Sequence, residues 1–184
     1  MADAAKIDLD VDAFLIWADG RDGRWELRDG HPVMMAPERA AHALTKLAAQ
    51  IALKDAIERA GLPCRAFPDG MTVRIAARTA FEPDALVVCP PPSDLNTMEI
   101  PNPIVVVEVL SPSTAADDHG IKLDSYFSLM SVEHYLIIDP DRRVMIHHKR
   151  GTEGAIETRI LREGVVRLEP PGLEADAASF FVAE

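Results

Sequence analysis

The segment Ile104-Val105-Val106-Val107-Glu108-Val109-Leu110 decides the fold, because it is a nearly continuous β-branched run. Ala85-Leu86-Val87-Val88-Cys89 is a second run of this kind. Strands that are covered on both faces read as continuous apolar runs, whereas strands with one wet face alternate. The two segments therefore predict neighbouring central strands of a sheet with helices on both sides, which is an α/β fold with a mixed central β-sheet flanked by helices.

Two strands and a short helix are predicted before this centre. An amphipathic segment, Leu9 to Ala18, stops at Gly20. The strand-like runs 24–28 and 32–35 are joined around Asp29-Gly30. Asp-Gly between two such runs indicates a hairpin, because both residues tolerate positive φ.

A long helix is predicted from Arg39 to Ala60. Apolar residues recur there at steps of three and four, as one helix face requires; they are Ala40, Leu44, Leu47, Ile51, Leu53 and Ile57. Gly61 follows the last turn and Pro63 comes soon after, which is the usual way for a helix to end.

The remaining elements complete one domain. A second helix is expected at about 117–130, with Ser113 or Thr114 as its cap. Further strands are expected at 64–67, 71–75, 134–138, 144–147, 155–161 and 165–168. We interpret residues 1–184 as a single domain with an N-terminal helix and hairpin (1–36), a core (37–150) and a C-terminal strand elaboration (151–184).

Composition excludes several classes of protein. The chain has 184 residues, 48% of them hydrophobic and 27% charged, as expected of a globular domain rather than a disordered chain. No apolar run is long enough to span a membrane, and Met1 to Lys6 lacks the features of a signal peptide. Cys64 and Cys89 are too few for a zinc site or a disulfide framework, so we expect reduced thiols and a cytoplasmic location.

The formal net charge of −11 argues mildly against a protein that binds duplex DNA. Such proteins usually carry a basic patch that displaces counterions from the phosphates. The largest basic clusters here are Arg142-Arg143 and Lys149-Arg150. Weak intrinsic affinity, a partner subunit or a bound metal would each be compatible with this charge.

Two carboxylates stand out at the ends of the apolar strands. Glu108 interrupts the most apolar run, where an ionised carboxylate is costly unless it is paired or metal-bound. Asp84 follows Pro83 and opens the other run. If the strands are neighbours, both carboxylates fit one coordination shell, and oxygen ligands of this kind suit Mg²⁺. A bound cation would polarise a phosphoryl oxygen and lower the pKa of a bound water.

Lys122 is the third candidate. It shares a helix face with Tyr126 and Leu129, at the border of the apolar stripe. An amine that points from there to the sheet would meet the carboxylates and could orient an attacking water or offset charge in the transition state.

Three motifs resemble one family. They are Glu82-Pro83-Asp84, the string Glu108-Val109-Leu110-Ser111-Pro112-Ser113-Thr114, and Lys122-Leu123-Asp124-Ser125-Tyr126. Together they are similar to the Uma-type restriction endonuclease family of the PD-(D/E)XK nuclease superfamily, formerly a domain of unknown function. The likeness also covers Trp25-Glu26-Leu27, Met35-Ala36-Pro37, His42 and the stretch from Tyr135 to Pro140.

The resemblance implies a restriction-endonuclease-like fold and metal-dependent cleavage of phosphodiesters. It implies that Asp84 and Glu108 are metal ligands and that Lys122 is the catalytic lysine. In the superfamily the lysine normally stands two residues after the acidic one, where this chain has Leu110. Members of this family supply it from the following helix, which agrees with Lys122.

Other polar residues are weaker candidates. His42, Glu38, Glu82 and Tyr126 are expected on the substrate side, although packing, helix-start and strand-edge roles are common for such residues. No G-x-S-x-G motif surrounds Ser111, so no serine nucleophile is indicated. His147-His148 are adjacent, which is a poor spacing for a metal pair, and we expect a strand with one exposed ring.

Two functions from different classes follow, and metal-dependent hydrolysis of RNA or of a branched DNA junction is a third possibility. The first is an endonuclease that hydrolyses DNA with Mg²⁺ or Mn²⁺, acting as a homodimer, since cutting two strands usually takes two sites. The second is an inactive domain that keeps the fold and binds nucleic acid or a protein partner. The acidity of the chain and Leu110 favour the second to some extent.

Overall fold

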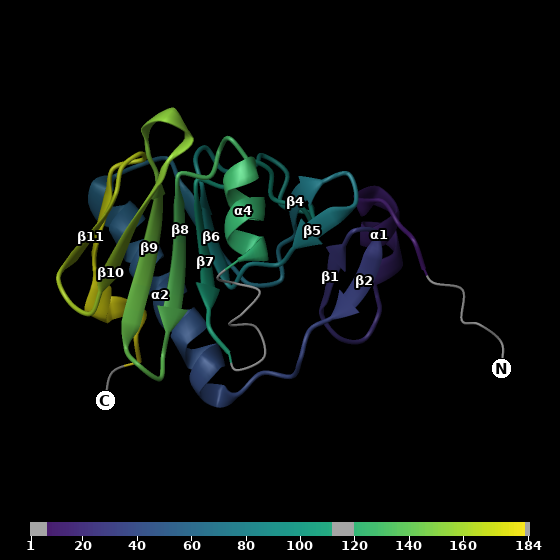
Figure 1. Cartoon of the computed structure of the whole chain (residues 1–184), viewed down its shortest axis with the longest axis horizontal. Coiled ribbons are helices and arrows are strands. Elements are labelled where there is room, and N and C mark those ends of the chain that lie inside the picture. Colours follow the sequence, from purple (N-terminus) through teal and green to yellow (C-terminus); the bar gives the residue numbers. More distant parts are fainter. Residues whose placement is uncertain (1–6, 112–119, 183–184) are drawn as a thin grey trace.

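The computed structural model describes residues 7–111 and 120–182. Within these residues a six-stranded sheet forms the centre (Figure 1). Its strands, from edge to edge, are β10 (Ile156–Leu161), β9 (Val144–Arg150), β8 (His134–Asp139), β7 (Val105–Val109), β6 (Ala85–Val88) and β3 (Arg65–Pro68). The pair β7–β8 is parallel and the other pairs are antiparallel. The sheet is mixed, which confirms the predicted fold class.

The two apolar runs lie in the middle of this sheet, as predicted. Every residue of β6 and β7 is buried. Val107 pairs with Ala85 on one side and with Leu136 on the other. Because β6 and β7 are antiparallel, the start of β6 lies beside the end of β7.

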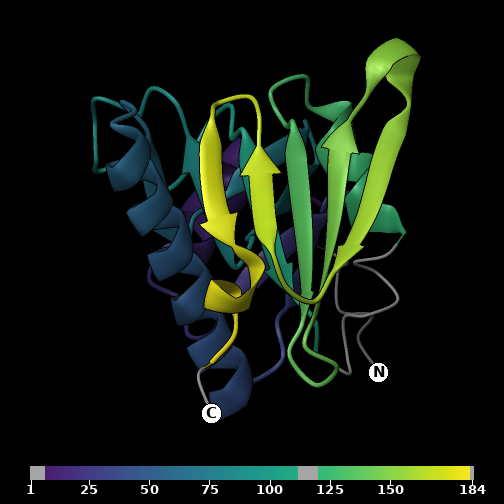
Figure 2. The same ribbon diagram turned by 90° about the vertical axis from the view of Figure 1, so that its left-hand side faces the viewer.

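Helices cover both faces of the sheet. On one face α2 (Ala40–Ala60) lies beside a hairpin of β11 (Val165–Leu168) and β12 (Leu173–Asp176), as Figure 2 shows. The short helix η2 (Ala177–Phe180) packs on the same side of the sheet, against α2. On the other face lies α4 (Ile121–Ser128), seen in front of the sheet in Figure 1.

A smaller sheet lies beyond α4 and carries the N-terminal hairpin (Figure 1). Its order is β2 (His31–Met34), β1 (Trp25–Arg28), β5 (Thr79–Phe81) and β4 (Val73–Ala76), and α1 (Val11–Ala18) packs against it. At the predicted hairpin turn, φ is 48° at Asp29 and 84° at Gly30. This agrees with the Asp-Gly signal.

The long helix is confirmed, but the apolar face assigned to it is largely wrong. Leu44, Leu47 and Ile51 are about half exposed, at 51%, 50% and 49%. The buried face consists mainly of small and polar residues together with the end of the predicted stripe, namely Thr45, Lys46, Ala49, Ala52, Leu53, Ala56 and Ile57. Small side chains allow the helix to approach the sheet closely, so tertiary packing outweighs the local hydrophobic pattern.

The expectation of two reduced thiols is also wrong, because Cys64 and Cys89 form a disulfide. The antiparallel pairing of β3 with β6 places Arg65 opposite Val88. The cysteines just beyond this pair therefore face each other, with their Cα atoms 4.4 Å apart. A contact made by strand pairing across 25 residues is not visible in the spacing of the cysteines.

Smaller differences concern short elements and the histidine pair. Strands β5 and β12 were not predicted. The predicted helix cap at Ser113 or Thr114 and the start of that helix lie outside the described residues. Neither His147 nor His148 is exposed, so the expectation of one exposed ring is wrong. The His147 ring packs against His134, with Nε2 2.9 Å from Nδ1 of His134.

Candidate active site

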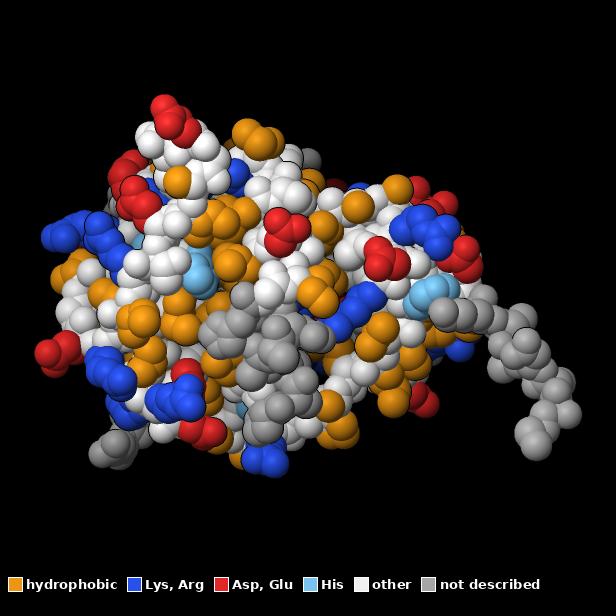
Figure 3. Space-filling model, viewed as in Figure 1, with side chains coloured by type: hydrophobic (Ala, Val, Ile, Leu, Met, Phe, Trp, Pro, Cys, Tyr) orange, Lys and Arg blue, Asp and Glu red, His pale blue; other side chains and the backbone are white. Residues whose placement is uncertain are grey.

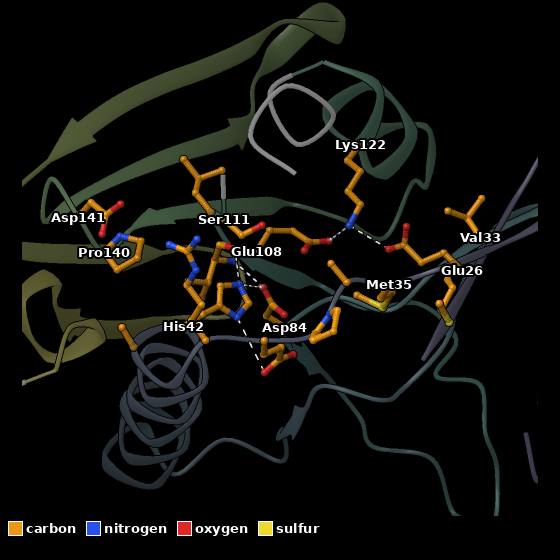
Figure 4. A pocket seen from close by; sticks show the side chains of 18 of the residues that line it. Glu26, Val33, Met35, His42, Asp84, Glu108, Ser111, Lys122, Pro140 and Asp141 are labelled. Atoms are coloured by element: carbon orange, nitrogen blue, oxygen red, sulfur yellow. Dashed lines mark hydrogen bonds and ion pairs between the residues drawn. The ribbon is translucent and has the colours of Figure 1, made fainter. Parts of the chain in front are cut away.

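A cleft of about 500 Å³ opens where β6 begins and β7 ends. Figure 4 shows side chains from several elements converging on it. The ionisable residues that line it include Glu26, Glu38, His42, Asp84, Glu108 and Lys122. Pro140 and Asp141 border one end of the cleft, and Val33 and Met35 border the other (Figure 4).

Asp84 is fixed by the backbone of the neighbouring strand. Its N–H donates to the carbonyl of Val107 at 3.0 Å, and its Oδ2 accepts from the N–H of Val109 at 2.7 Å. Only 4% of Asp84 is exposed. Burial raises the pKa of the Asp84 carboxyl, although the Val109 hydrogen bond works in the opposite direction. A buried carboxylate held at the mouth of a cleft is suited to binding a cation.

Glu108 is bound by two residues of α4. Its Oε1 accepts from Nζ of Lys122 at 2.8 Å and from the hydroxyl of Tyr126 at 2.8 Å. Glu108 and Lys122 are exposed by only 4% and 3%. Burial, followed by the charge of Glu108, raises the pKa of Tyr126 well above its ordinary value, so Tyr126 acts as a hydrogen-bond donor. The helix face predicted for Lys122 and Tyr126 is the face that meets Glu108.

A second carboxylate at Lys122 was missed by the sequence. Oε1 of Glu26 forms an ion pair with Nζ of Lys122 at 2.9 Å, and its Oε2 accepts from Arg28 at 2.9 Å. Glu26 is buried in β1. An acidic residue next to Leu27 in a short strand gives a weak signal, because strand alternation normally places it in water. The Lys122 ammonium therefore lies between two buried carboxylates from different sheets.

His42 lies on the helix side of the cleft, near the start of α2. Its Nε2 is 2.8 Å from the carbonyl oxygen of Val109, so Nε2 carries the proton and donates. Nδ1 is buried and accepts no hydrogen bond among the described residues. A histidine that ligates a metal typically donates its other N–H to a carbonyl or carboxylate, and His42 has this arrangement.

Three side chains in the described part of the chain come close enough to hold a metal ion together. They are Glu38, His42 and Asp84, and one ligand atom from each lies within 4.8 Å of the others. Nδ1 of His42, the ring nitrogen that does not bind Val109, is 3.9 Å from Oε2 of Glu38. The group combines two hard oxygen donors with an imidazole nitrogen, which suits Mn²⁺ and is compatible with Mg²⁺.

Lys46, one turn after His42, is another residue that the sequence did not single out. It is buried, its Nζ donates to Glu38 and Asp69, and it lies 3.6 Å from Oδ1 of Asp84. Burial alone would lower the pKa of Lys46, but the hydrogen bonds to Asp69 and Glu38 outweigh it and the pKa is raised. Lys46 is therefore protonated and supports the carboxylates around it.

Arg24 completes the charge network on this side. It lies 2.7 Å from Glu38, 2.7 Å from Asp69 and 3.2 Å from Glu82. In this network two cations, Arg24 and Lys46, meet four carboxylates, those of Glu38, Asp69, Glu82 and Asp84. The carboxyl groups therefore outnumber the cations in this network, and burial raises the pKa of the Glu82 and Asp84 carboxyls.

The structure brings most of the predicted residues together. Asp84, Glu108, Lys122, Glu38 and His42 line the cleft, and Tyr126 reaches it through Glu108. Glu82 is not among the residues that line the cleft and instead pairs with Arg24.

A family model for Uma2, described as "Putative restriction endonuclease", matches residues 11–179. The chain belongs to the Uma2 family. Two relatives of this Uma2 chain come from Synechocystis sp. (strain ATCC 27184 / PCC 6803 / Kazusa), and both are described as uncharacterised. The protein slr1290 is 26% identical over 143 residues, covering 77% of this chain and 74% of the relative. The protein sll1609 is 32% identical over 101 residues, covering 53% of this chain and 57% of the relative.

A solved structure confirms the fold of this Uma2 chain. It is a "putative nuclease belonging to DUF820" from Anabaena variabilis ATCC 29413, with a TM-score of 0.74 and 16% sequence identity. The match covers 94% of this chain and 97% of the other. The described helices of this Uma2 chain include none long and apolar enough to cross a membrane.

Proposed function

We propose that this protein is an endonuclease that hydrolyses DNA phosphodiester bonds with a divalent cation, Mg²⁺ or Mn²⁺. The observation that carries the proposal is the convergence of Asp84, Glu108 and Lys122, all nearly fully buried, on one cleft. Three buried ionisable groups around an open cavity mark a functional site more often than a structural one. Membership of the Uma2 family supports the same reaction class.

The residues present fit a cation. Asp84 is the central ligand in this proposal, because it lies between the strand side of the cleft and the helix side. Glu108 is the second ligand, from the adjacent strand. Nδ1 of His42 and the carboxylate of Glu38, which Arg24 and Lys46 also bind, are the candidate ligands on the helix side. The excess of carboxyl groups over cations in the network on that side supports the binding of a cation there.

A bound cation would act as a Lewis acid on the phosphoryl oxygen and would lower the pKa of a bound water. The chain itself contributes binding and positioning. Asp84 is held rigid by the Val109 amide, and Glu108 is held by Lys122 and Tyr126. Residues that are fixed before the substrate arrives need no reorganisation during the reaction.

Lys122 is the proposed catalytic lysine. Its ammonium donates to Glu108 and faces the cleft, so it can also donate to a water or to a phosphate oxygen there. Charge that develops on the phosphate in the transition state would be stabilised by this ammonium. The helix-borne lysine would thus take the place of a lysine at Leu110, which lies two residues after Glu108 on the strand.

Two further parts of the proposal concern assembly and location. A homodimer would supply the two sites needed to cut both strands of a duplex. Light scattering of the purified protein would show about twice the mass of one 20.1 kDa chain. A cytoplasmic site of action is proposed on the basis of the DNA substrate, and it requires that the chain also folds when Cys64 and Cys89 are reduced.

One observation favours the second candidate function, a binding module without turnover. The Lys122 ammonium is shared by two carboxylates, Glu26 and Glu108, and so is held in place by both. A lysine held in this way can be purely structural. The net charge of −11 also disfavours tight binding of duplex DNA by the whole surface.

Plasmid cleavage separates the two functions. Supercoiled plasmid is incubated with Mg²⁺ or Mn²⁺ and the wild-type protein, Glu108→Gln or Lys122→Ala. Metal-dependent nicking by the wild type that falls by about 10²-fold or more in both variants supports the nuclease. Asp55→Asn, an exposed acid on α2 outside the cleft, is the matched control and should cleave as the wild type does. Activity that survives in both variants points to a contaminant, and the absence of cleavage with either metal supports the binding module.

A further inference from the structure

The turn between β8 and β9 forms one wall of the cleft and carries exposed arginines. Pro140 and Asp141 line the cleft, and Arg142 and Arg143 follow directly. The N–H of Arg142 donates to Oδ1 of Asp139 at 3.0 Å, which fixes the turn. The sequence had shown Arg142-Arg143 only as one small basic cluster without a place in the fold.

Strand pairing brings a third arginine to this turn. β9 and β10 pair with Met145 opposite Leu161, so the residue after Leu161 emerges beside the start of β9. That residue is Arg162, and its guanidinium donates to the carbonyl of Arg142 at 3.1 Å. Arg142 and Arg162 therefore lie together although 20 residues separate them.

Arg143 has a different role. Its guanidinium donates to the carbonyl of Val182 at 3.1 Å and lies 5.4 Å from the centre of the Phe181 ring. These contacts attach the C-terminal segment to the turn. Arg143 is therefore occupied within the fold, whereas Arg142 extends into water with 81% of its side chain exposed.

Arg39 lies on the helix side of the same cleft. It precedes α2, is exposed and lines the cleft. Arg142 has one ion-pair partner among the described residues, Asp139, at 3.7 Å, and a pair this exposed holds the arginine only weakly. In Figure 3, Lys and Arg side chains gather along the lower edge of the molecule, where the β8–β9 turn lies in Figure 1.

We propose that Arg39, Arg142 and Arg162, here called the arginine rim, bind the backbone phosphates of a DNA strand that enters the cleft. The inference rests on the proposed function and deepens it by naming the surface that holds the substrate. On a chain with a net charge of −11 the whole surface repels a polyanion, so attraction must come from a local group of cations. Arginine suits this role because its planar guanidinium can bind phosphate through two hydrogen bonds.

The rim predicts a defined salt dependence. Each phosphate contact contributes a slope of about −0.7 to −0.9 to a plot of log affinity against log salt concentration. Three contacts give a slope of about −2 to −3, which is far smaller than that of a protein with an extended basic face.

Fluorescence anisotropy with a labelled DNA oligonucleotide tests the inference on the full-length chain. Binding is measured at several salt concentrations, in Ca²⁺ and in EDTA in parallel, for the wild type and for the double variant Arg142→Gln/Arg162→Gln. The variant should bind at least about tenfold more weakly at low salt and should lose about 1.4 to 1.8 from the slope. Adding Arg39→Gln should remove most of the remaining slope.

Two matched variants serve as controls. Arg65 is exposed and pairs with Val88, at the end of β6 that lies away from Asp84. Arg65→Gln removes one positive charge there and should leave the slope unchanged. Arg143→Gln should lower the melting temperature, because it releases the Val182 carbonyl, and should also leave the slope unchanged.

The outcomes separate this inference from the nuclease proposal. Plasmid cleavage by the wild type, with the rim variants binding as Arg65→Gln does, overturns the rim and leaves the nuclease intact. Loss of binding in the rim variants without cleavage by any form overturns the nuclease and keeps the rim. A wild type that binds no oligonucleotide at low salt also overturns the rim.

Discussion

Nζ of Lys122 lies 2.8 Å from Oε1 of Glu108, and the two side chains are only 4% and 5% exposed. The pair joins α4 to β7, and Glu26 of β1 binds the same ammonium. The contact therefore ties the small sheet, the helix and the central sheet together at the cleft. Removing one partner of a buried ion pair is costly, because the charge that remains is neither paired nor hydrated.

The first prediction concerns this pair. Lys122→Met should lower the free energy of unfolding by about 3–5 kcal/mol, because the buried carboxylates of Glu26 and Glu108 then lose the cation that they share. Adding Glu108→Gln should recover part of the loss, so the two changes are not additive. Urea unfolding of the two single variants and the double variant measures this coupling.

Lys54→Met is the matched control. Nζ of Lys54 lies 2.8 Å from Glu58, but the two side chains are 62% and 63% exposed. A solvated pair one turn apart contributes little to stability, so this variant should unfold almost as the wild type does. Equal losses in Lys54→Met and Lys122→Met would contradict the role assigned to burial.

The second prediction concerns His42. If Nδ1 of His42 is a ligand, His42→Ala should weaken Mn²⁺ binding by about tenfold or more, as measured by isothermal titration calorimetry. His31→Ala is the control, because His31 binds the carbonyl of Ile7 outside the cleft. Glu38→Gln and Glu108→Gln in the same titration show whether the cation lies toward the helix or toward the strand. Unchanged affinity in His42→Ala would remove the histidine from the metal site.

The third prediction concerns acid stability. Burial lowers the pKa of His134 to about 4 and the pKa of His147 to about 3. Nε2 of His134 donates to the carbonyl of Pro170 at 2.8 Å, and its Nδ1 accepts from His147. Both rings are therefore neutral in the fold. Above pH 6.5 both are neutral in the unfolded chain as well, so their contribution to stability does not change with pH there.

Below pH 6.5 the two histidines take up protons in the unfolded chain but stay neutral in the folded one. The free energy of unfolding therefore falls as the pH drops toward 3. We expect the pair to account for a loss of about 4–6 kcal/mol between pH 7 and pH 4. Urea unfolding across this range should show a flatter profile for His134→Asn/His147→Gln than for the wild type. His31→Gln should keep the steep profile, and a double variant as steep as the wild type would refute the assignment.

The fourth prediction concerns Cys64 and Cys89. A crosslink across 25 residues restricts the unfolded chain and should contribute about 3 kcal/mol. Reduction with dithiothreitol should therefore lower the midpoint of urea unfolding for the wild type. Cys64→Ala/Cys89→Ala should unfold at the lower midpoint with or without the reductant. A wild-type midpoint that is insensitive to reduction would contradict the prediction.

Long and uniform segments could be predicted from the sequence. The runs that became β6 and β7, and the extent of α2, follow from local pattern alone. β5 and β12 have only three and four residues, too few to establish a period. The buried face of α2 could not be predicted from hydrophobicity, which pointed to Leu44 and Leu47. The helix instead packs on the sheet with the small residues Ala49 and Ala52, because they allow a close approach.

The residues of the candidate site could likewise be predicted only in part. Asp84 and Glu108 were found because a carboxylate beside an apolar strand is conspicuous. Lys46 and Glu26 were missed because a charged residue in a helix or a short strand is usually solvated. Their partners come from distant segments, as when Lys46 binds Asp69 across 23 residues. Such contacts exist only after the sheets have assembled.

β6 carries the candidate chemistry and the crosslink at its two opposite ends. Asp84 precedes the strand and Cys89 follows it. Oxidation of the thiols would thus raise the free energy of unfolding and leave the geometry of the cleft unchanged. The redox state of the surroundings would then set the fraction of the protein that is folded. The residues of the cleft would set the activity of each folded molecule.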